Sequence, residues 1–261
     1  MPTANVRGIA MRYEWAGRED APVLVLSCSL GTTLALWEPQ LRAFARSFRV
    51  LRYDMRGHGG STVTAGPYSI EMLGQELLGL LDGLGVSTAR YCGISIGGMI
   101  GQWLAVHAPE RFVRMVFSNT AAKIGTAEGW NQRIEQVRRE GMRGVADAVI
   151  ARWFTDSFAE AQPQTIAAMR QMLLACDPEG YTAACAAIRD MDLRAQLSDI
   201  RMPVCILGGS HDPVTTMEDA AWLHKQIGRS QLSALPASHI ANVEAAGEFN
   251  AAVLQFLEVT P

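Results

Sequence analysis

The chain of 261 residues lacks the features that mark several classes of protein. No stretch reaches the roughly 18 consecutive apolar residues of a membrane-spanning helix, and residues 1–13 contain no apolar run that could serve as a signal peptide. The 23 Lys and Arg face 26 Asp and Glu, with a net charge of -3 and no block of like charges, so the basic surface of a nucleic-acid-binding protein is missing. We therefore expect a cytoplasmic protein that binds neither membrane nor nucleic acid.

Cysteine and histidine are also scarce, with five residues of each. The odd number of cysteines and the absence of a C-x-x-C pair argue against a disulfide framework and against a zinc site. No other cluster of ligating residues stands out, so neither a metal nor an organic cofactor is expected. The 49% of hydrophobic residues is instead enough for a large folded core.

What the sequence does contain is an alternation of short apolar runs and amphipathic segments. Continuous apolar runs are typical of strands buried on both faces, and spacings of three and four residues are typical of helices. The predicted strands are 8–15, 23–26, 49–53, 89–93, 112–118, 204–207 and 231–235, and the predicted helices are 37–48, 70–84, 97–107 and 241–257. This order predicts an α/β fold with a mostly parallel central sheet flanked by helices.

The alternation stops between residues 122 and 190, where the apolar spacing is helical and no strand is evident. We expect residues 122–190 to form a helical cap, or lid, inserted into the sheet domain. Residues 1–121 and 191–261 would then form the core domain.

Residues Gly93-Ile94-Ser95-Ile96-Gly97 match the pattern G-x-S-x-G between a predicted strand and a predicted helix. This context is typical of a nucleophile elbow, in which a sharp turn exposes the serine hydroxyl. A glycine-rich turn without chemistry is the simpler alternative, but the position after a buried strand favours Ser95 as a nucleophile.

A serine needs a base to accept its proton, and the base needs an acid to orient it. Strand 204–207 leads to Asp212, and strand 231–235 leads to His239. Both therefore lie at the carboxyl edge of the sheet, where ligands bind in such folds. His58 precedes the serine, His211 adjoins Asp212, and two further histidines lie within helices, so His239 is the predicted base and Asp212 the orienting acid.

A tetrahedral intermediate also needs backbone N–H groups to bind its oxyanion. The residue after the nucleophile, Ile96, is one predicted donor, and Leu30 in the loop after strand 23–26 is the other. Cys28 in the same loop is either a second nucleophile or, as we favour, a small packed side chain, since no base accompanies it.

The motifs together resemble those of the α/β hydrolases. Asp54-Met55-Arg56-Gly57-His58-Gly59-Gly60-Ser61 resembles their D-x-R-G-x-G-x-S segment, and the elbow, Gly208–Asp212 and Ser238-His239 fit as well. Many members have His-Gly where this chain has Cys28-Ser29. The resemblance covers nearly the whole chain and implies the α/β-hydrolase fold with an inserted lid.

Within that superfamily the chain is most similar to the 3-oxoadipate enol-lactonases. The similar segments are Ser29-Leu30-Gly31-Thr32, Leu51-Arg52-Tyr53-Asp54, Ala122-Lys123-Ile124-Gly125-Thr126, Ala151-Arg152-Trp153-Phe154 and His239-Ile240-Ala241-Asn242. The resemblance implies hydrolysis of 3-oxoadipate enol-lactone to 3-oxoadipate in aromatic catabolism, through an acyl-enzyme. The substrate carries a carboxylate, for which Arg133 is the predicted partner, and Trp130 and Trp153 are predicted to enclose the lactone ring.

Other roles for Arg133, Trp130 and Trp153 remain open, and so do two other classes of function besides the lactonase. Arg133 would otherwise be a solvated residue on a helix face, and the tryptophans would be packing residues of the lid. The enzyme would otherwise be another carboxylesterase, a C–C bond hydrolase or a perhydrolase, because a fold does not fix a substrate. A small-ligand binding protein without turnover is the third class, and the intact serine, histidine and aspartate argue against it. The sequence leaves the oligomeric state unknown.

Overall fold

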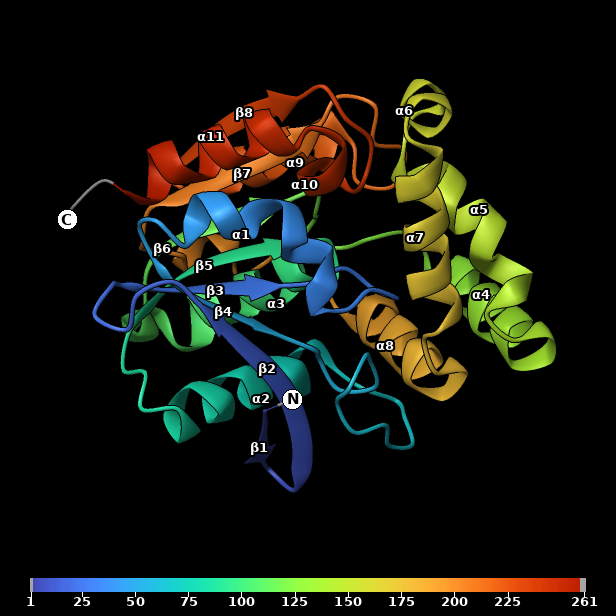
Figure 1. Cartoon of the computed structure of the whole chain (residues 1–261), viewed down its shortest axis with the longest axis horizontal. Helices are drawn as coiled ribbons and strands as arrows, with labels where there is room; N and C mark the ends of the chain where they lie inside the picture. Colours follow the sequence, from blue (N-terminus) through green and yellow to red (C-terminus); the bar gives the residue numbers. More distant parts are fainter. Residues whose placement is uncertain (1, 259–261) are drawn as a thin grey trace.

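The computed structural model describes residues 2–258, and within them eight strands form a single sheet (Figure 1). The strand order across the sheet is β1-β2-β4-β3-β5-β6-β7-β8. The strands are Thr3–Val6 (β1), Ile9–Ala16 (β2), Val23–Ser27 (β3), Arg49–Tyr53 (β4), Ala89–Ile94 (β5), Phe112–Ser118 (β6), Val204–Gly209 (β7) and Ser230–Leu235 (β8). Residues 1 and 259–261, which the predicted core domain includes, lie outside the described residues.

The central strands β3 to β7 form the core of the sheet because they are apolar almost throughout. Strands β3, β4, β5, β6, β7 and β8 pair in parallel, and only the β1–β2 and β2–β4 pairs are antiparallel. Every residue of β7 is buried, as are nearly all residues of β3, β4 and β5. Strands buried on both faces read as continuous apolar runs, which is why the sequence predicted them.

The edge strand β1 is the part of the sheet that the sequence analysis missed. It pairs only with β2, across a turn in which Arg7 and Gly8 both have positive φ angles, of 50° and 85°. Of its four residues only Val6 is buried. A short strand that buries one side chain leaves neither an apolar run nor a clear alternation to recognise.

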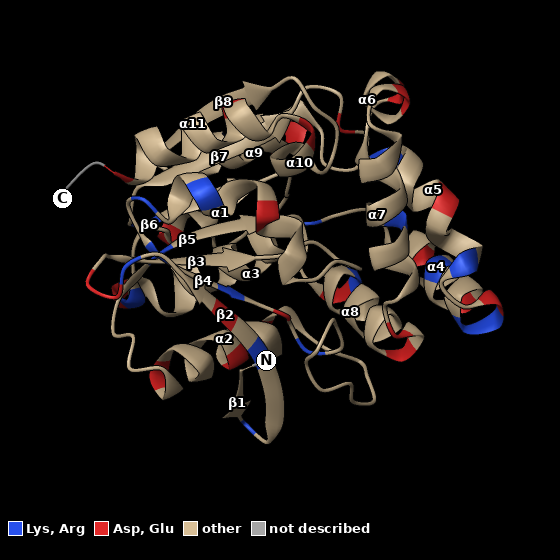
Figure 2. Cartoon of the chain, in the orientation of Figure 1, with Lys and Arg blue, Asp and Glu red and all other residues tan. Residues whose placement is uncertain are grey.

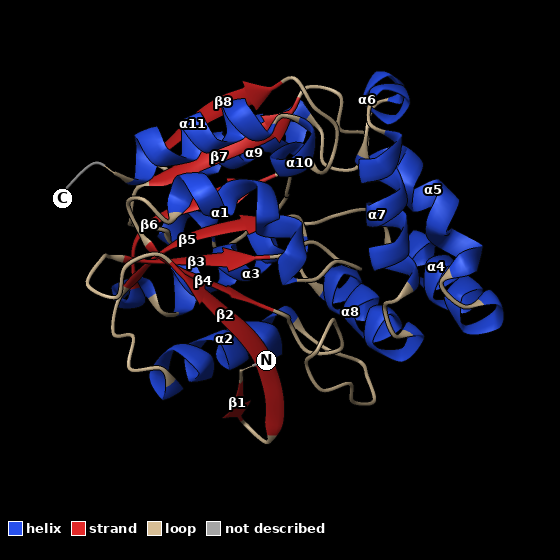
Figure 3. Cartoon of the chain, viewed as in Figure 1, coloured by secondary structure: helices blue, strands red, loops and turns tan. Residues whose placement is uncertain are grey.

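Helices cover both faces of the sheet (Figure 3). The α-helices of the core are Glu38–Phe44 (α1), Ile70–Gly83 (α2), Ile96–His107 (α3), Met217–Gln226 (α9), Ala241–Glu244 (α10) and Ala246–Leu257 (α11). Helices α1 and α11 pack against each other on one face, and α2 and α3 pack against each other on the other. Short 3-10 helices occur at Leu34–Trp37, Pro109–Arg111 and Leu197–Asp199.

Two predicted helices differ from those observed. The helix expected at 37–48 is a 3-10 turn followed by α1, which ends at Phe44 because hydrogen-bonded turns must redirect the chain into β4 at Arg49. The helix expected at 241–257 is two helices, separated by Ala245 with φ -117° and ψ 50°, outside the helical region.

The connection between β6 and β7 contains five further helices (Figure 1). They are Ala127–Glu140 (α4), Arg143–Trp153 (α5), Asp156–Ala161 (α6), Pro163–Leu174 (α7) and Pro178–Asp190 (α8). The group lies beyond the carboxyl ends of the parallel strands, and α4 packs against both α5 and α8. Ligands bind at this edge of α/β sheets, so these helices stand over the expected site.

Lys and Arg positions alternate with Asp and Glu positions along the ribbon (Figure 2). Within residues 2–258, no helix has the length and apolar character needed to cross a bilayer.

Candidate active site

Ser95 occupies a sharp turn between β5 and α3. Its φ of 58° and ψ of -119° lie in a region that residues with a side chain rarely adopt. The turn is fixed by hydrogen bonds at both ends of the residue, from Ser95 N to Ser118 O at 3.0 Å and from Thr120 Oγ1 to Ser95 O at 2.8 Å. This is the strand-to-helix geometry that the G-x-S-x-G pattern predicted.

Glycines at the elbow let β3 and α3 approach closely. A Cβ atom added to Gly97 would lie 2.4 Å from Ser27 O, and one added to Gly93 would lie 2.4 Å from Gly97 O. Gly97 N donates to Cys28 O at 3.2 Å, which joins the helix to the loop after β3. The two glycines are therefore required by close backbone packing.

The structure brings the three residues predicted as nucleophile, base and acid into one hydrogen-bonded chain. His239 Nε2 lies 3.0 Å from Ser95 Oγ, and His239 Nδ1 lies 2.8 Å from Asp212 Oδ2. All three residues are buried. With an ionised Asp212, Nδ1 carries the ring proton and donates a hydrogen bond to the carboxylate, which leaves the Nε2 lone pair directed at the serine hydroxyl.

The Asp212 carboxylate is held by more donors than the histidine alone. Oδ1 accepts from the backbone of Val214 at 2.7 Å and Thr215 at 3.1 Å, and Oδ2 accepts from Thr215 Oγ1 at 2.7 Å and Asn119 Nδ2 at 3.0 Å. Burial alone would raise the pKa of Asp212, but the His239 ring and the side-chain donors of Thr215 and Asn119 lower it to about 2. The acid is therefore ionised and fixed in orientation.

Asn119 is a site residue that the sequence analysis missed. It has a φ of 45°, and its side-chain amide donates both to Asp212 Oδ2 and to Ser238 O, the latter at 3.1 Å. It thus joins the acid to the segment that carries His239. Its position directly after β6, at the same sheet edge as the other two strand ends, is the only sequence signal that could have identified it.

The His239 segment is tied to the helical insertion. Ser238 Oγ donates to Arg152 O at 2.9 Å, and Ile240 N donates to Trp153 O at 3.0 Å, so the end of α5 is attached here. Glu244 Oε2 accepts from Ser238 N at 2.8 Å, and its Oε1 accepts from the Thr155 hydroxyl. Because Glu244 ends α10, these contacts explain why α10 is separate from α11.

Of the two predicted oxyanion donors, Ile96 directly follows the serine in the chain and Leu30 lies in the loop after β3. Leu30 lines the same pocket as Ser95, and Ile96 is the first residue of α3, where a backbone N–H has no partner within the helix. Neither amide donates a backbone hydrogen bond in the described part of the chain. Both are therefore available to an oxyanion, although this role remains a prediction.

The other candidate bases and the candidate second nucleophile have different surroundings. His211 is exposed, and His58 contacts the loop after β3. His107 hydrogen-bonds to Trp103 O, and His224 hydrogen-bonds to the Ser230 hydroxyl. Cys28 is buried with its Sγ 3.2 Å from Thr33 O, and burial raises the pKa of its thiol. A thiolate nucleophile is not favoured there.

A pocket of about 360 Å³ opens at Ser95 and His239. Its lining combines the loop after β3, the Asp212 turn and the helical insertion. The predicted substrate residues Trp130, Arg133 and Trp153 all line this pocket, together with Tyr181 and Ile188 of α8. Trp130 is held by a hydrogen bond from its indole Nε1 to Ile124 O at 2.7 Å, and both tryptophans are buried.

Two guanidinium groups face the pocket, of which the sequence analysis singled out only Arg133. Arg133 lies over the Trp130 ring at 4.9 Å, and Arg152 of α5 lines the same space. Burial and the neighbouring Arg133 lower the pKa of Arg152. Among the described residues neither has an acidic partner, and the ion pairs of this region involve other arginines, such as Arg139 with Glu140.

Comparison with known proteins agrees with this arrangement. Residues 21–246 match the family described as alpha/beta hydrolase fold. The chain is 43% identical to 3-oxoadipate enol-lactonase 2 of Acinetobacter baylyi, over 96% of this chain and 94% of that protein. It is 37% identical to 3-oxoadipate enol-lactonase 1 of the same organism, over 94% and 92%. It also superposes on the crystal structure of the enol-lactonase from Burkholderia xenovorans LB400 with a TM-score of 0.98 and 42% identity, covering 99% of this chain and 100% of that one.

Proposed function

Because the chain belongs to the α/β-hydrolase fold family, we propose that it hydrolyses 3-oxoadipate enol-lactone to 3-oxoadipate through an acyl-enzyme on Ser95. The observation that carries the proposal is the hydrogen-bonded chain of Ser95, His239 and Asp212. It opens into a pocket that holds two guanidinium groups for which residues 2–258 supply no acidic partner. The enol-lactonase relatives reported above support this substrate.

The first half of the reaction opens the lactone ring. Ser95 Oγ attacks the lactone carbonyl while His239 Nε2 takes its proton, and Asp212 stabilises the imidazolium that forms. The carbonyl oxygen becomes an oxyanion, bound by the N–H groups of Leu30 and Ile96. When the intermediate collapses, the ring C–O bond breaks and His239 returns the proton to the departing enolate oxygen, whose tautomerisation to a ketone drives the step forward.

The second half releases the product. A water molecule attacks the Ser95 ester and gives its proton to His239, and the second tetrahedral intermediate uses the same two N–H donors. Collapse returns the proton to Ser95 Oγ and frees a product with one ketone, whose new carboxylic acid then loses its proton to solvent to give the dicarboxylate. One water is consumed in total, and the serine and histidine end as they began.

The two arginines give this site its substrate preference. A guanidinium that is partly buried without a counterion loses hydration without gaining an ion pair, so a ligand carboxylate supplies the missing partner. The carboxylate of the enol-lactone would lie between Arg133 and Arg152, with its ring against Trp130 and Trp153. The helices α4, α5 and α8 then serve as the lid of the site, in keeping with the cap proposed for residues 122–190.

The test compares turnover of the enol-lactone with turnover of a neutral aryl acetate. Ser95→Ala should abolish both activities, and Asp212→Asn should lower kcat by on the order of 10³- to 10⁴-fold for both. Arg133→Ala and Arg152→Ala should each raise KM about 10- to 100-fold for the enol-lactone only, since each removes a charged contact. Arg139→Ala, on the same helix as Arg133 but exposed and paired with Glu140, is the matched control.

Two outcomes would contradict the proposal. Strong aryl acetate hydrolysis without enol-lactone turnover would indicate another esterase, and equal losses on both substrates in the arginine variants would remove the carboxylate-binding role.

The five buried, unpaired cysteines are in keeping with a reducing compartment, and we place the enzyme in the cytoplasm on that ground.

A further inference from the structure

The loop that supplies Leu30 to the pocket is a tight turn. Thr32 N donates to Ser29 O at 3.2 Å, and Gly31 between them has a φ of 76°, as the third residue of a type II turn requires. The direction of the Leu30 N–H depends on the peptide planes of this turn. Whatever fixes the turn therefore fixes that donor relative to Ser95.

His58 contacts this turn directly. Its Nε2 accepts a hydrogen bond from Gly31 N at 3.0 Å, and its Nδ1 lies 3.2 Å from Arg56 O. Because Gly31 N can only donate, Nε2 is unprotonated, and Nδ1 carries the ring proton and donates a hydrogen bond to the Arg56 carbonyl. The ring is 2% exposed, and burial lowers the pKa of His58 to about 4. Nε2 therefore stays unprotonated at neutral pH and remains a hydrogen-bond acceptor.

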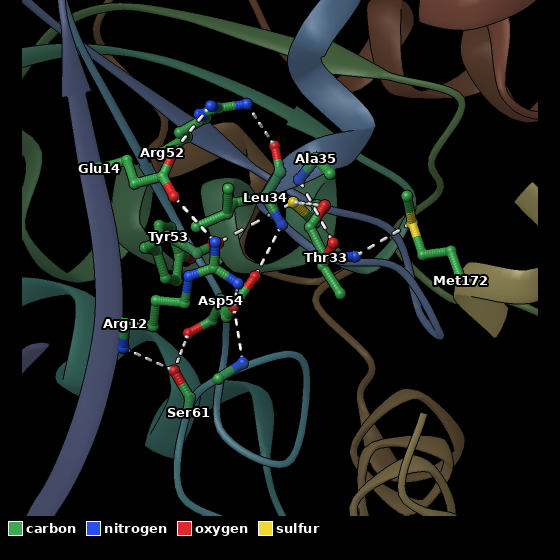
Figure 4. Close-up of polar contacts among 12 residues, drawn as sticks. Arg12, Glu14, Thr33, Leu34, Ala35, Arg52, Tyr53, Asp54, Ser61 and Met172 are labelled. Atoms are coloured by element: carbon green, nitrogen blue, oxygen red, sulfur yellow. Dashed lines mark hydrogen bonds and ion pairs between the residues drawn. The ribbon is translucent and has the colours of Figure 1, made fainter. Parts of the chain in front are cut away.

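The same motif that carries His58 holds the far end of the loop (Figure 4). Asp54 Oδ1 accepts from Leu34 N at 2.7 Å, and Oδ2 accepts from Gly60 N at 2.8 Å. Ser61 Oγ donates to Asp54 O at 2.6 Å, which closes the motif on itself. The segment 54–61 thus binds the loop at two points, Gly31 and Leu34, with residues 32 and 33 between them.

Helix α7 of the inserted helices also contacts the loop. Thr33 N lies 3.4 Å from Met172 Sδ of α7 (Figure 4), and a Cβ atom at Gly31 would lie 2.6 Å from Leu173 Cδ1. Hydrogen bonds to sulfur are weak, and the contact with Leu173 is apolar. His58 therefore supplies the directional contact at Gly31.

We propose that His58 is a positioning residue for the oxyanion hole, which orients the Leu30 N–H toward Ser95 by accepting the hydrogen bond of Gly31. Occupying the Gly31 N–H also leaves Leu30 as the donor of this turn that faces the substrate. The proposal rests on the hydrolytic function proposed above but not on the identity of the substrate. It gives the histidine of the segment Arg56-Gly57-His58-Gly59 a role that the mechanism itself leaves unassigned.

The test replaces His58 with Phe, Asn and Gln. Phe keeps the ring but has no acceptor, Asn places its amide near the position of Nδ1, and Gln reaches the position of Nε2 with the same number of bonds from Cβ. The readouts are kcat and KM for an aryl acetate, the inhibition constant of an aryl trifluoromethyl ketone, and the dissociation constant of adipate. The ketone forms a tetrahedral oxyanion with the serine and so reports on the oxyanion hole.

We expect the Phe and Asn variants to lose about 10- to 100-fold in kcat, somewhat less than the loss of a whole oxyanion donor. Ketone binding should weaken by the same factor, while KM and adipate binding stay within about threefold of wild type. The Gln variant should recover most of both losses. His107→Gln, at an exposed histidine far from the loop in sequence, is the control and should match wild type.

Three results would overturn the proposal. One is wild-type kcat and ketone binding in the Phe and Asn variants, and another is an equal loss of adipate binding, which would indicate general damage to the pocket. The third is a Gln variant as impaired as Phe. If wild-type protein reacts with neither the ester nor the ketone, it is the hydrolase function that fails, which is a separate and recognisable outcome.

Discussion

At the scale of single residues, the site depends on ionisable groups whose protonation differs between the folded and unfolded states. Burial lowers the pKa of His58 to about 4, below the ordinary value near 6.5. The pKa of Asp212 is lowered to about 2 in spite of its burial, through His239 and the donors around it. In both cases the unfolded chain binds protons at a higher pH than the folded chain, so acidification destabilises the fold.

The two residues therefore act in different pH windows. The stability supplied by a neutral His58 is complete above about pH 6.5 and is lost as the pH falls toward 4, by about 3 kcal/mol in total. The stability supplied by Asp212 is complete above about pH 4 and is lost toward pH 2, by about 2 kcal/mol. Urea unfolding of His58→Gln should show a much flatter dependence between pH 7 and pH 4, while Asp212→Asn keeps the wild-type slope there. A wild-type slope in His58→Gln would contradict the assignment.

At the scale of elements, the nucleophile elbow is limited by backbone packing. Gly97→Ala places a Cβ atom 2.4 Å from Ser27 O and 2.9 Å from Cys28 O. Both obstacles are backbone atoms, so no side chain can rotate away, and α3 must move from β3. We expect a loss of about 3 kcal/mol in the free energy of unfolding and a loss of kcat, because the movement separates Ile96 from Leu30.

The same substitution at Gly247 is the matched control. Gly247 lies in α11, and nothing stands within 4 Å of an added Cβ. Ala at this position should raise the stability by about 0.5 kcal/mol, because alanine favours the helix over glycine. Denaturant unfolding and aryl acetate turnover of both variants measure the contrast. Equal behaviour of the two would show that the close approach at Gly97 does not limit the elbow.

The sequence predicted those strands and helices whose buried residues form a recognisable pattern within the segment itself. The inner strands were found because each is a continuous apolar run, and Ser95 was found because its turn has a local pattern. Strand β1 was missed because it buries only Val6. The break at Ala245 was missed because its cause is Glu244, whose partners Ser238 and Thr155 come from two other segments.

At the scale of the whole molecule, the site combines groups that are far apart along the chain. Asn119, Arg152 and His58 were not given site roles from the sequence, since each acquires one only through a distant partner. Asn119 meets Asp212 across 93 residues, and His58 meets Gly31 across 27. The order serine, aspartate, histidine could be predicted because the parallel topology places successive strand ends at one edge.

The pocket also joins the sheet to the inserted helices, since Ser95 and His239 follow the ends of strands β5 and β8, and Arg133 and Arg152 belong to α4 and α5. A dicarboxylate that contacts both parts should stabilise the whole fold by mass action. Adipate at about 100 times its dissociation constant should add about 2.7 kcal/mol to the free energy of unfolding. In a chain of this size, each kcal/mol raises Tm by roughly 2–4 °C.

This stabilisation should depend on the arginines and not on the nucleophile. Thermal unfolding should show the full increase with adipate in Ser95→Ala and almost none in a variant that combines Arg133→Ala with Arg152→Ala. Hexanediol, which has the same length without charge, should leave Tm unchanged in all three proteins. An equal increase in the double arginine variant would mean that adipate binds elsewhere, and the lid would then lack the anion-binding role that links it to the catalytic edge of the sheet.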